Sequence, residues 1–506
     1  MASLRCLAGV SLAFGVLGGC SLIYDADDLR RHGGVDARPP LPDADPQGLA
    51  LTRVVDHGAF YEGTGTGGGR AALLDIEGAN ITSDAEVTVA FTDGGDPGAG
   101  GDDGMLRAIE TVVSPWADRM VVAVELPVLR DLDDQATRQV TVTATQVGVS
   151  AQVTFDVAGL EQLAPAGPDV DAGTLKPLYS FVRFVDGVHF KGSEPALIRS
   201  TGLIILSAKV DVDGRNEVPG AHGCPGGAAA TSGGCGRGGG HNGDEGLAGA
   251  GGGGGGFAST GDPATNAGTT FGQGGEETGG AMLAILRVDG MGEGNRGNGG
   301  GGGGNGTLGT GGKGGGGGGV LELTAGGAVR VDRGAASADG GNGALGTGVT
   351  AGGDGGGGSG GAILVRGAGG IQYTTPWLGA AKGTSAGNGG AGSLGRVRID
   401  SADASIAAAA SGVTPVRGPA WVKDTPRIVR TPSAELTLTG EAGRTYAVIV
   451  NDGAAANVSF SGATRAVTVA LHDGVNQVCA VADPAVTPLR PENENCIQIG
   501  YVPTAP

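Results

Sequence analysis

The sequence predicts an all-β protein in which two small β-sandwiches flank a central glycine-rich β domain. Three observations favour this fold. Runs of alternating or continuous Val recur near both ends of the chain, turn residues separate them, and no helical periodicity interrupts them. Aromatic residues make up 4 % of the chain, which argues against one large aromatic core. Glycine occupies 108 of 506 positions and is concentrated in the central part of the chain.

The balance of charge narrows the classes of partner. Lys and Arg total 33 whereas Asp and Glu total 52, which gives a formal net charge of −19. Proteins bind nucleic acids mainly through Lys and Arg that neutralise phosphates, so the composition argues against a nucleic-acid partner. The same argument speaks against an anionic membrane surface as a purely electrostatic partner.

Residues 1–19 have the shape of a secretory signal. One Arg precedes the apolar stretch "LAGVSLAFGVLGG", which is shorter than the about 20 apolar residues of a spanning helix. The run Leu17-Gly18-Gly19-Cys20 resembles the lipobox of bacterial lipoproteins. The resemblance implies that residues 1–19 are a lipoprotein signal peptide and that Cys20 becomes the lipidated first residue. Ser21 then implies the outer membrane, with the protein facing the periplasm or the cell surface. An ordinary signal peptide with an incidental cysteine is the alternative.

Residues 20–50 are predicted to be a disordered tether behind the lipidated Cys20. This stretch is rich in Asp, Pro and small residues and has little to bury after Tyr24, so burial cannot offset the entropy of ordering it. Each buried methylene of an acyl chain adds about 0.8 kcal/mol to membrane binding, so several chains would hold the protein where one would not.

Residues 51–165 are predicted to form the first β-sandwich. The runs "EVTVAF", "MVVAVELP", "RQVTVTAT" and "AQVTFDVAGL" are rich in Val and are separated by turn residues. The spacing Leu74-x-Ile76-x-Gly78-x-Asn80, followed later by Val140-x-Val142, resembles the IPT/TIG immunoglobulin-like domain. The resemblance implies an Ig-like sandwich. An acidic insertion at residues 93–103 departs from the family pattern, and it is interpreted as a solvated loop, with a weak calcium site as the alternative.

Residues 175–400 are predicted to form a repeat domain. Paired strand-like runs such as "VLELTAGGAVRV" and "AILVRGAGGIQY" recur at a spacing of roughly 40 residues, which is typical of repeats that complete each other's core. Three tracts of six consecutive glycines lie among them, at 251–256, 299–304 and 314–319. The repeat therefore combines a strand part with a glycine part.

Two states are open to the glycine tracts. A flexible coil is the default for glycine-rich sequence. The alternative is a bundle of polyglycine II helices, extended threefold helices whose N–H and C=O groups bond to neighbouring helices. Tracts that end in "GGGGGGVLEL" and "GGGGSGGAILV" resemble the glycine-rich domain of the anaplastic lymphoma kinase family, which implies a β scaffold carrying such a bundle. The opening strands equally resemble a parallel β-helix. We expect β structure with at least partly ordered tracts.

Residues 420–506 return to strand-like alternation and predict a small C-terminal Ig-like β-sandwich. The runs that indicate it are "AELTLTG", "TYAVIVNDG" and "AVTVALHDGVNQVCAVA".

The cysteines agree with export. Cys6 leaves with the signal and Cys20 takes lipid, so an even number of thiols remains in an oxidising compartment. These thiols fall into two close pairs that predict two disulfides, Cys224 with Cys235 and Cys479 with Cys496. A zinc set made of the first pair with His222 and His241 is the alternative.

The sequence offers few residues for chemistry, and we predict no catalytic, cofactor-binding or metal-binding residue and no cofactor. Gly357–Gly361 fits the nucleophile motif G-x-S-x-G, but no helix pattern follows it. Asp211–Gly214 resembles part of a calcium loop and is better explained as a strand that ends in an Asp-Gly turn. Two Arg-x-Asp pairs in the repeats are interpreted as solvent-facing: Arg287 with Asp289, and Arg330 with Asp332.

The first functional hypothesis is a non-enzymatic outer-membrane lipoprotein that displays a glycine-rich β scaffold for adhesion, binding or envelope structure. Its partners would be the membrane, through Cys20, and polysaccharide or protein at the cell surface. The alternative is a carbohydrate-active enzyme, a polysaccharide lyase or hydrolase, built on a parallel β-helix. A third hypothesis is that the central block is a disordered spacer between two Ig-like domains.

Overall fold

The computed structural model describes residues 48–55, 70–92, 105–126, 138–157, 161–165, 167–246, 249–265, 272–278, 296–348, 352–374, 376–385, 387–402, 409–422, 428–451, 453–482 and 495–504. In these ranges β-strands dominate the regular structure, which confirms the all-β prediction. The predicted signal peptide, Cys20 and almost all of the predicted tether lie outside the described residues. Within the described part, no helix is long and apolar enough to span a bilayer.

The first strands form a seven-stranded sheet that curls around one core, and the terminal strands β1 and β7 contact each other. Leu74 and Ile76 face this core with Val140 and Val142, and all four side chains are fully buried, as the alternation of the sequence predicts. The strands, in sheet order, are β1 (Ala50–Val55), β2 (Arg70–Ala79), β5 (Arg119–Leu126), β4 (Met105–Val113), β3 (Glu86–Phe91), β6 (Arg138–Gln146) and β7 (Val149–Val157).

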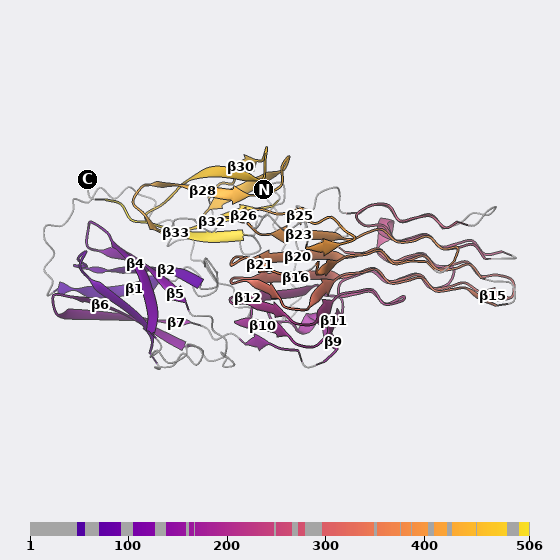
Figure 1. Cartoon of the computed structure of the whole chain (residues 1–506), viewed down its shortest axis with the longest axis horizontal. Coiled ribbons are helices and arrows are strands. Elements are labelled where there is room, and N and C mark those ends of the chain that lie inside the picture. Colours follow the sequence, from indigo (N-terminus) through magenta and orange to yellow (C-terminus); the bar gives the residue numbers. More distant parts are fainter. Residues whose placement is uncertain are drawn as a thin grey trace, which may run out of the picture. The chain divides into compact units, whose positions relative to one another are not determined.

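Three parallel sheets follow, and successive strands of the chain pass from one sheet to the next, so they wind into a parallel β-helix (Figure 1). Sheet 1 contains β8 (Gln162–Leu163), β10 (Phe181–Phe184), β13 (Ile204–Leu206), β17 (Val329–Val331) and β21 (Ile371–Gln372). Sheet 2 contains β9 (Asp169–Asp171), β11 (Val188–Lys191), β14 (Lys209–Asp211), β18 (Ala335–Ser337), β22 (Leu378–Gly379) and β24 (Ala410–Ser411). Sheet 3 contains β12 (Ala196–Ser200), β16 (Val320–Ala325), β20 (Ala362–Gly367), β23 (Arg396–Asp400) and β25 (Val416–Arg417).

The inside of the β-helix is a stack of aliphatic side chains. In sheet 3 the register aligns four fully buried residues on neighbouring strands, Ile198, Leu323, Val365 and Ile399. Each strand is too short to bury its apolar face alone, so each turn depends on the turns above and below it. This stacking explains the spacing of roughly 40 residues between the repeats.

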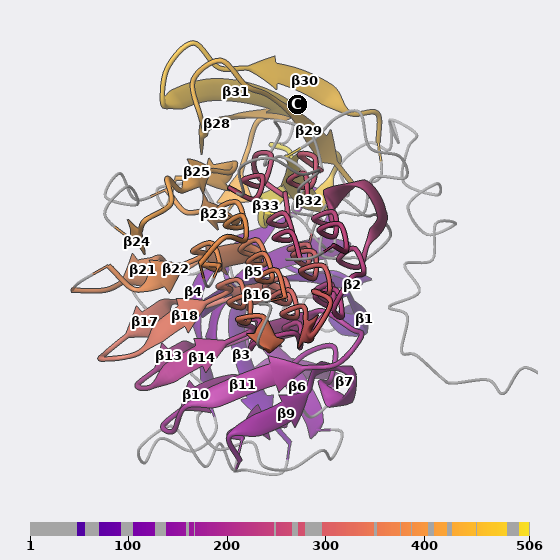
Figure 2. The ribbon, with the colours of Figure 1, turned by 90° about the vertical axis from the view of Figure 1, so that its right-hand side faces the viewer.

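The glycine tracts leave the β-helix at one corner, always between a strand of sheet 2 and a strand of sheet 3. They occupy residues 212–319, 338–361 and 380–395 between β14 and β16, β18 and β20, and β22 and β23. We call the described residues of these three ranges the glycine bundle. Figure 1 shows its tracts running side by side away from the strands, with β15 (Gly309–Thr310) at their far end. Figure 2 looks along the tracts, which are seen as adjacent coils.

The last strands form two facing sheets around a core that includes Leu436, Tyr446, Val478 and Ile499. One sheet has the order β26 (Ala420–Trp421), β28 (Ser433–Thr439) and β31 (Thr464–Ala470). The other has the order β27 (Ile428–Val429), β33 (Asn495–Tyr501), β32 (Gly474–Val481), β29 (Thr445–Val450) and β30 (Ala456–Ser459). The predicted disulfide Cys479–Cys496 joins directly opposite residues of β32 and β33.

Candidate functional site

Hydrogen bonds between neighbouring backbones hold the glycine bundle together. Bonds between one pair of tracts recur at every third residue, with N···O distances of 2.8, 2.8 and 2.9 Å: Gly312 to Gly353, Gly315 to Gly356, and Gly318 to Ser359. A period of three is that of the polyglycine II helix, the extended threefold form. The described tracts therefore pair in the pattern that a polyglycine II bundle requires.

The amides between these positions bond to other neighbours. The N–H of Gly314 donates to the carbonyl of Gly227 at 2.8 Å, and the N–H of Gly316 donates to that of Asn216 at 2.5 Å. The carbonyl of Gly315 in turn accepts from Gly300 at 2.8 Å. One tract is thus bonded on several sides, which satisfies backbone groups that burial would otherwise leave without partners.

Close approach explains why these positions are glycine. A Cβ atom built on Gly356 would overlap the backbone oxygen of Gly253, and one built on Gly358 would overlap that of Gly316. A backbone atom cannot swing aside as the end of a side chain can. The bundle therefore requires glycine for steric reasons, at the entropic cost that glycine carries.

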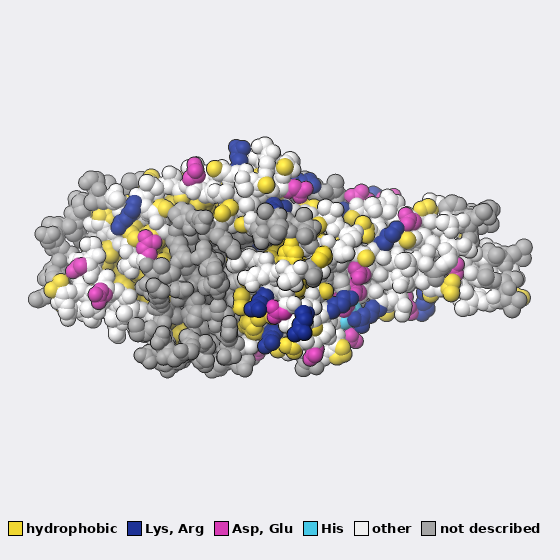
Figure 3. Space-filling model, in the orientation of Figure 1, with side chains coloured by type: hydrophobic (Ala, Val, Ile, Leu, Met, Phe, Trp, Pro, Cys, Tyr) yellow, Lys and Arg dark blue, Asp and Glu magenta, His cyan; other side chains and the backbone are white. Residues whose placement is uncertain are grey.

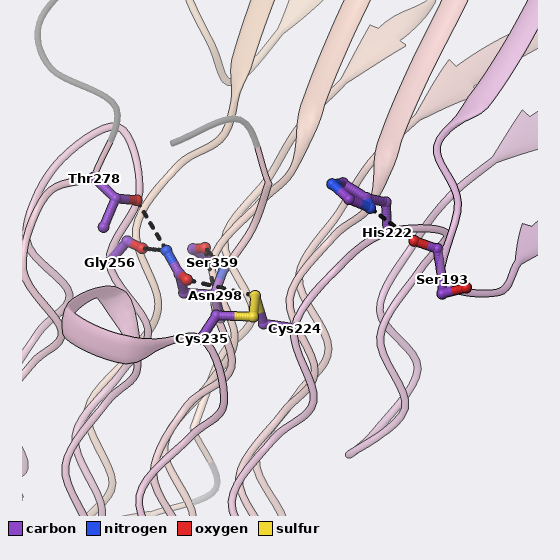
Figure 4. The surroundings of a disulfide bond; sticks show 8 residues. All are labelled: Ser193, His222, Cys224, Cys235, Gly256, Thr278, Asn298 and Ser359. Carbon is purple, nitrogen blue, oxygen red and sulfur yellow. Dashed lines mark hydrogen bonds between the residues drawn. A yellow bond between two sulfur atoms is a disulfide. The ribbon is translucent and has the colours of Figure 1, made fainter. Parts of the chain in front are cut away.

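A polar junction lies at the base of the bundle (Figure 4). The side chain of Asn298 is fully buried, and its Nδ2 donates to the carbonyl of Gly256 at 2.5 Å and to Thr278 Oγ1 at 3.0 Å. The N–H of Asn298 donates to Ser359 Oγ at 2.7 Å. These bonds tie three tracts together where the glycine run is interrupted. Ser359 is fully buried in this role and a strand follows it, so the geometry is not that of a nucleophile elbow.

The disulfide Cys224–Cys235 lies beside this junction and confirms the predicted pairing (Figure 4). Closing a loop of this length typically contributes about 2–4 kcal/mol. Nearby, His222 Nδ1 donates a hydrogen bond to the carbonyl oxygen of Ser193 at 2.7 Å, because a carbonyl oxygen can only accept. His241 is exposed. The described residues contain no group of three or more His, Cys, Asp or Glu side chains arranged to hold a metal ion.

The far end of the bundle presents apolar side chains on a fixed frame. The leucines Leu308 and Leu345 are 69 % and 64 % exposed. β15 follows Leu308 directly and pairs with β19 (Thr347–Gly348), which follows Leu345 by two residues. Asp354 accepts hydrogen bonds from the N–H groups of Gly346 and Asn388 at 3.0 and 2.8 Å, which fixes two of the turns. Exposed leucines on such a frame are a candidate contact surface.

The outer face of sheet 2 carries a row of polar residues, because the register aligns Asp169, His189, Asp211 and Ser337. His189 Nδ1 lies 2.5 Å from Asp211 Oδ1, and both residues are 5 % exposed. Burial raises the pKa of the Asp211 carboxyl, but the hydrogen bond from His189 and the charge of Lys209 outweigh it and hold that pKa below its usual value.

Arg215 completes this cluster. Its guanidinium nitrogens lie 3.5 Å from Asp211 and 3.8 Å from Asp169. In this cluster the carboxylates therefore contact basic side chains of the protein itself, and the histidine is buried among them. An enclosed, internally compensated histidine favours a structural role over general acid or base catalysis.

A second acidic pair, Asp213 and Asp339, lies two residues beyond Asp211 and Ser337 along the chain. Asp213 Oδ1 accepts the N–H of Asp339 at 2.7 Å, and Asp339 Oδ1 accepts the N–H of Ala381 at 2.7 Å. Burial, and then the charge of Asp213, raises the pKa of the Asp339 carboxyl. The folded protein thus holds the Asp339 proton more tightly than the unfolded chain does, so this group's contribution to stability falls as the pH rises through the interval between the two pKa values.

Asp339→Asn is therefore expected to raise the free energy of unfolding at pH 7 and to change it little at pH 3, where the wild-type carboxyl is already neutral. The Asn oxygen still accepts the N–H of Ala381. Urea unfolding at the two pH values measures the difference. Asp332→Asn, at an exposed pair, is the control and is expected to give no gain at pH 7. A gain of equal size at both pH values would contradict the prediction.

The outer face of sheet 3 holds buried ion pairs. Arg199 contacts Glu322 in a bidentate pair at 2.7 and 3.0 Å. Burial raises the pKa of Glu322, but Arg199 outweighs this and lowers it. Asp400, which is fully buried, accepts from Arg366 at 3.1 Å and from Arg398 at 2.6 Å. This network was not predicted from the sequence, although Arg398 and Asp400 have the Arg-x-Asp spacing noted for Arg330 and Asp332.

The structure also shows the positions of several other residues that the sequence analysis singled out. Asp211 ends β14, as the strand-and-turn interpretation of Asp211–Gly214 predicts. Arg330 and Asp332 form an exposed ion pair at 2.8 Å, which confirms their solvent-facing interpretation. Arg287, Asp289 and the acidic insertion 93–103 lie outside the described residues.

Comparison with known proteins finds no family model, curated protein or solved structure that matches this chain. The resemblances to the lipobox, to IPT/TIG domains and to the glycine-rich domain of the anaplastic lymphoma kinase family therefore stay predictions.

Proposed function

We propose that the chain is a non-enzymatic lipoprotein of the outer membrane, anchored through Cys20, in which the glycine bundle presents a binding end to a polysaccharide or protein of the cell surface. The bonded order of the glycine tracts is the observation that carries this proposal. A flexible glycine linker would let its far end sample many positions, whereas a bonded bundle holds that end in place.

The distribution of side chains supports the proposal. Where the glycine tracts pack, the backbones approach too closely for side chains. Apart from buried junction residues such as Asn298 and Ser359, side chains are therefore found mainly on the outer surface and at the far end. Leu308 and Leu345 lie at that end and are among the large hydrophobic residues that remain exposed in the described part of the chain. An apolar contact on a prearranged frame loses little entropy on binding.

A carbohydrate-active enzyme remains the alternative function. The polar row on sheet 2 is the place where such chemistry would have to occur. Its central histidine is enclosed, and the carboxylate nearest to it is paired with His189 and Arg215. This pairing favours binding or scaffolding over catalysis.

Co-sedimentation with insoluble polysaccharides and isolated cell envelopes tests the proposal. The full chain carrying Cys20→Ser is compared with a variant that adds Leu308→Ser and Leu345→Ser, and with a control that adds Val218→Ser at a site 55 % exposed nearer the β-helix. We expect binding that the paired leucine substitutions weaken and the control retains. Binding that the leucine substitutions leave unchanged would contradict the role of the far end. Release of soluble oligosaccharide would favour the alternative function, a carbohydrate-active enzyme.

Labelling of cells with radioactive palmitate tests the anchor separately. We expect label on the wild-type chain and none on Cys20→Ser. Equal labelling of both chains would contradict the role of Cys20.

A further inference from the structure

The outer face of sheet 1 carries a row of residues that the sequence keeps far apart. The register aligns Arg183, Ile205, Arg330 and Gln372 on the neighbouring strands β10, β13, β17 and β21. Their neighbours in the strands, such as Val182 and Ile204, fill the core, so the row points outward. Arg183, Arg330 and Gln372 are exposed, and Ile205 is half-buried between the two arginines.

Apolar, basic and acidic side chains surround this row. Val185, which follows β10, is 52 % exposed, and Phe181 and Leu203 are partly exposed. Arg333 is a third exposed arginine beside it, and the exposed Asp332 lies there too, with its Oδ1 2.8 Å from Arg330 Nε. Figure 3 shows Lys and Arg side chains gathered around β10, with hydrophobic and acidic side chains between them. We use the name arginine face for the surface that is formed by Phe181, Arg183, Val185, Leu203, Ile205, Arg330, Arg333 and Gln372.

The spacing of charge on the arginine face is regular. Neighbouring strands lie about 4.8 Å apart, so Arg183 and Arg330, two strands apart, are separated by about 10 Å along the axis of the β-helix. Ile205 fills the strand between them and Gln372 continues the row. The row therefore holds two arginines two strands apart, with an isoleucine on the strand between them and a glutamine on the strand after the second.

We propose that the arginine face binds a linear acidic polysaccharide that carries one carboxylate on every second sugar and lies across the strands of sheet 1. In an extended β-linked chain each sugar is about as long as one strand spacing, so alternate sugars meet successive arginines. Guanidinium groups pair with carboxylates in a bidentate geometry. Because Arg330 Nε contacts Asp332, Arg330 would meet a sugar carboxylate through its two terminal nitrogens. Ile205 contacts the apolar face of the sugar between them, and Gln372 offers both a donor and an acceptor to hydroxyl groups.

Charge complementarity favours this occupant over a membrane. The chain as a whole carries a net charge of −19, which opposes approach to an extended anionic surface. A single sugar chain needs to meet only the narrow row of arginines. The inference goes beyond the proposed function, because it places a ligand on the β-helix instead of the far end of the glycine bundle.

Titration of the full chain carrying Cys20→Ser with hyaluronan oligosaccharides tests this inference, since hyaluronan has one carboxylate per two sugars. The variants are Arg183→Gln, Arg330→Gln and their combination. Arg465→Gln, at an exposed arginine of the C-terminal sandwich, is the matched control. Chitin oligosaccharides, polyphosphate and vesicles of phosphatidylglycerol are the comparison ligands.

We expect hyaluronan to bind at low salt and to be weakened by added salt. Each single substitution is expected to weaken binding roughly threefold to fivefold, whereas Arg465→Gln and the paired leucine substitutions at the far end leave it unchanged. Absence of hyaluronan binding at low salt would overturn the inference. So would binding that survives the double substitution, equally tight binding of polyphosphate, or binding of the vesicles in place of the sugar.

Discussion

Gly356→Ala is expected to destabilise the glycine bundle by about 3 kcal/mol, at the upper end of what overpacking of a core costs. The added methyl group would overlap the backbone oxygen of Gly253, and Gly252 and Gly253 belong to a tract that is bonded on other sides as well. Rotamer changes cannot relieve a clash with backbone, so whole tracts would have to separate. Differential scanning calorimetry of the variant measures the loss as a lowered transition of the central domain.

Gly462→Ala is the matched control for this experiment. A Cβ atom at Gly462 meets nothing within 4 Å, so we expect the substitution to leave the transitions unchanged. An equal response to the two substitutions would contradict close approach as the reason for glycine in the bundle. The comparison separates the steric requirement of the bundle from the general effect of alanine on the unfolded chain.

Asp400→Asn is expected to cost about 3–5 kcal/mol in the free energy of unfolding, because it removes the buried carboxylate charge that two buried guanidinium groups share. The carboxylate of Asp400 is fully buried and accepts from both Arg366 and Arg398. The substitution keeps the shape of the side chain and removes only its charge. Urea unfolding at pH 7 measures the change.

Asp332→Asn removes a carboxylate from an exposed pair with Arg330 and is expected to change the free energy of unfolding by less than about 1 kcal/mol. If Asp332→Asn and Asp400→Asn lowered the free energy of unfolding by similar amounts, burial of the charges would not explain the effect of Asp400→Asn.

Local patterns in the sequence were enough to predict many of the strands. Alternation of Val with polar residues predicts β3 and β6, and the apolar run after a glycine tract predicts β16. The close spacing of the cysteines predicts both disulfides. These features depend on neighbours in the sequence, and a half-buried strand imprints its period of two directly on the chain.

Features that depend on register between turns of the β-helix were not predictable in this way. The strand β18 was missed because its residues, Ala335–Ser337, are small and show no alternation. Arg183 and Arg330 come into one row only because the intervening tract returns to the adjacent turn. The pairing of Arg366 with Asp400 likewise depends on which strands are neighbours, because Arg366 lies on β20 and Asp400 on β23.

The glycine tracts show most clearly what cannot be predicted from the sequence. Their composition is compatible with a flexible coil and with a bonded bundle, and a side-chain pattern that would distinguish the two does not exist in a run of glycines. The distinction rests on hydrogen bonds between tracts that are distant in the sequence, such as Gly314 with Gly227.

Amide hydrogen exchange of the glycine tracts in the native protein tests the central claim most directly. The account predicts that the amides of Gly312, Gly315 and Gly318, which donate to the neighbouring tract, exchange far more slowly than the same amides in urea. Exchange at the rate of an unstructured glycine peptide would contradict the bonded bundle, and with it the proposal that the bundle holds a binding end in place.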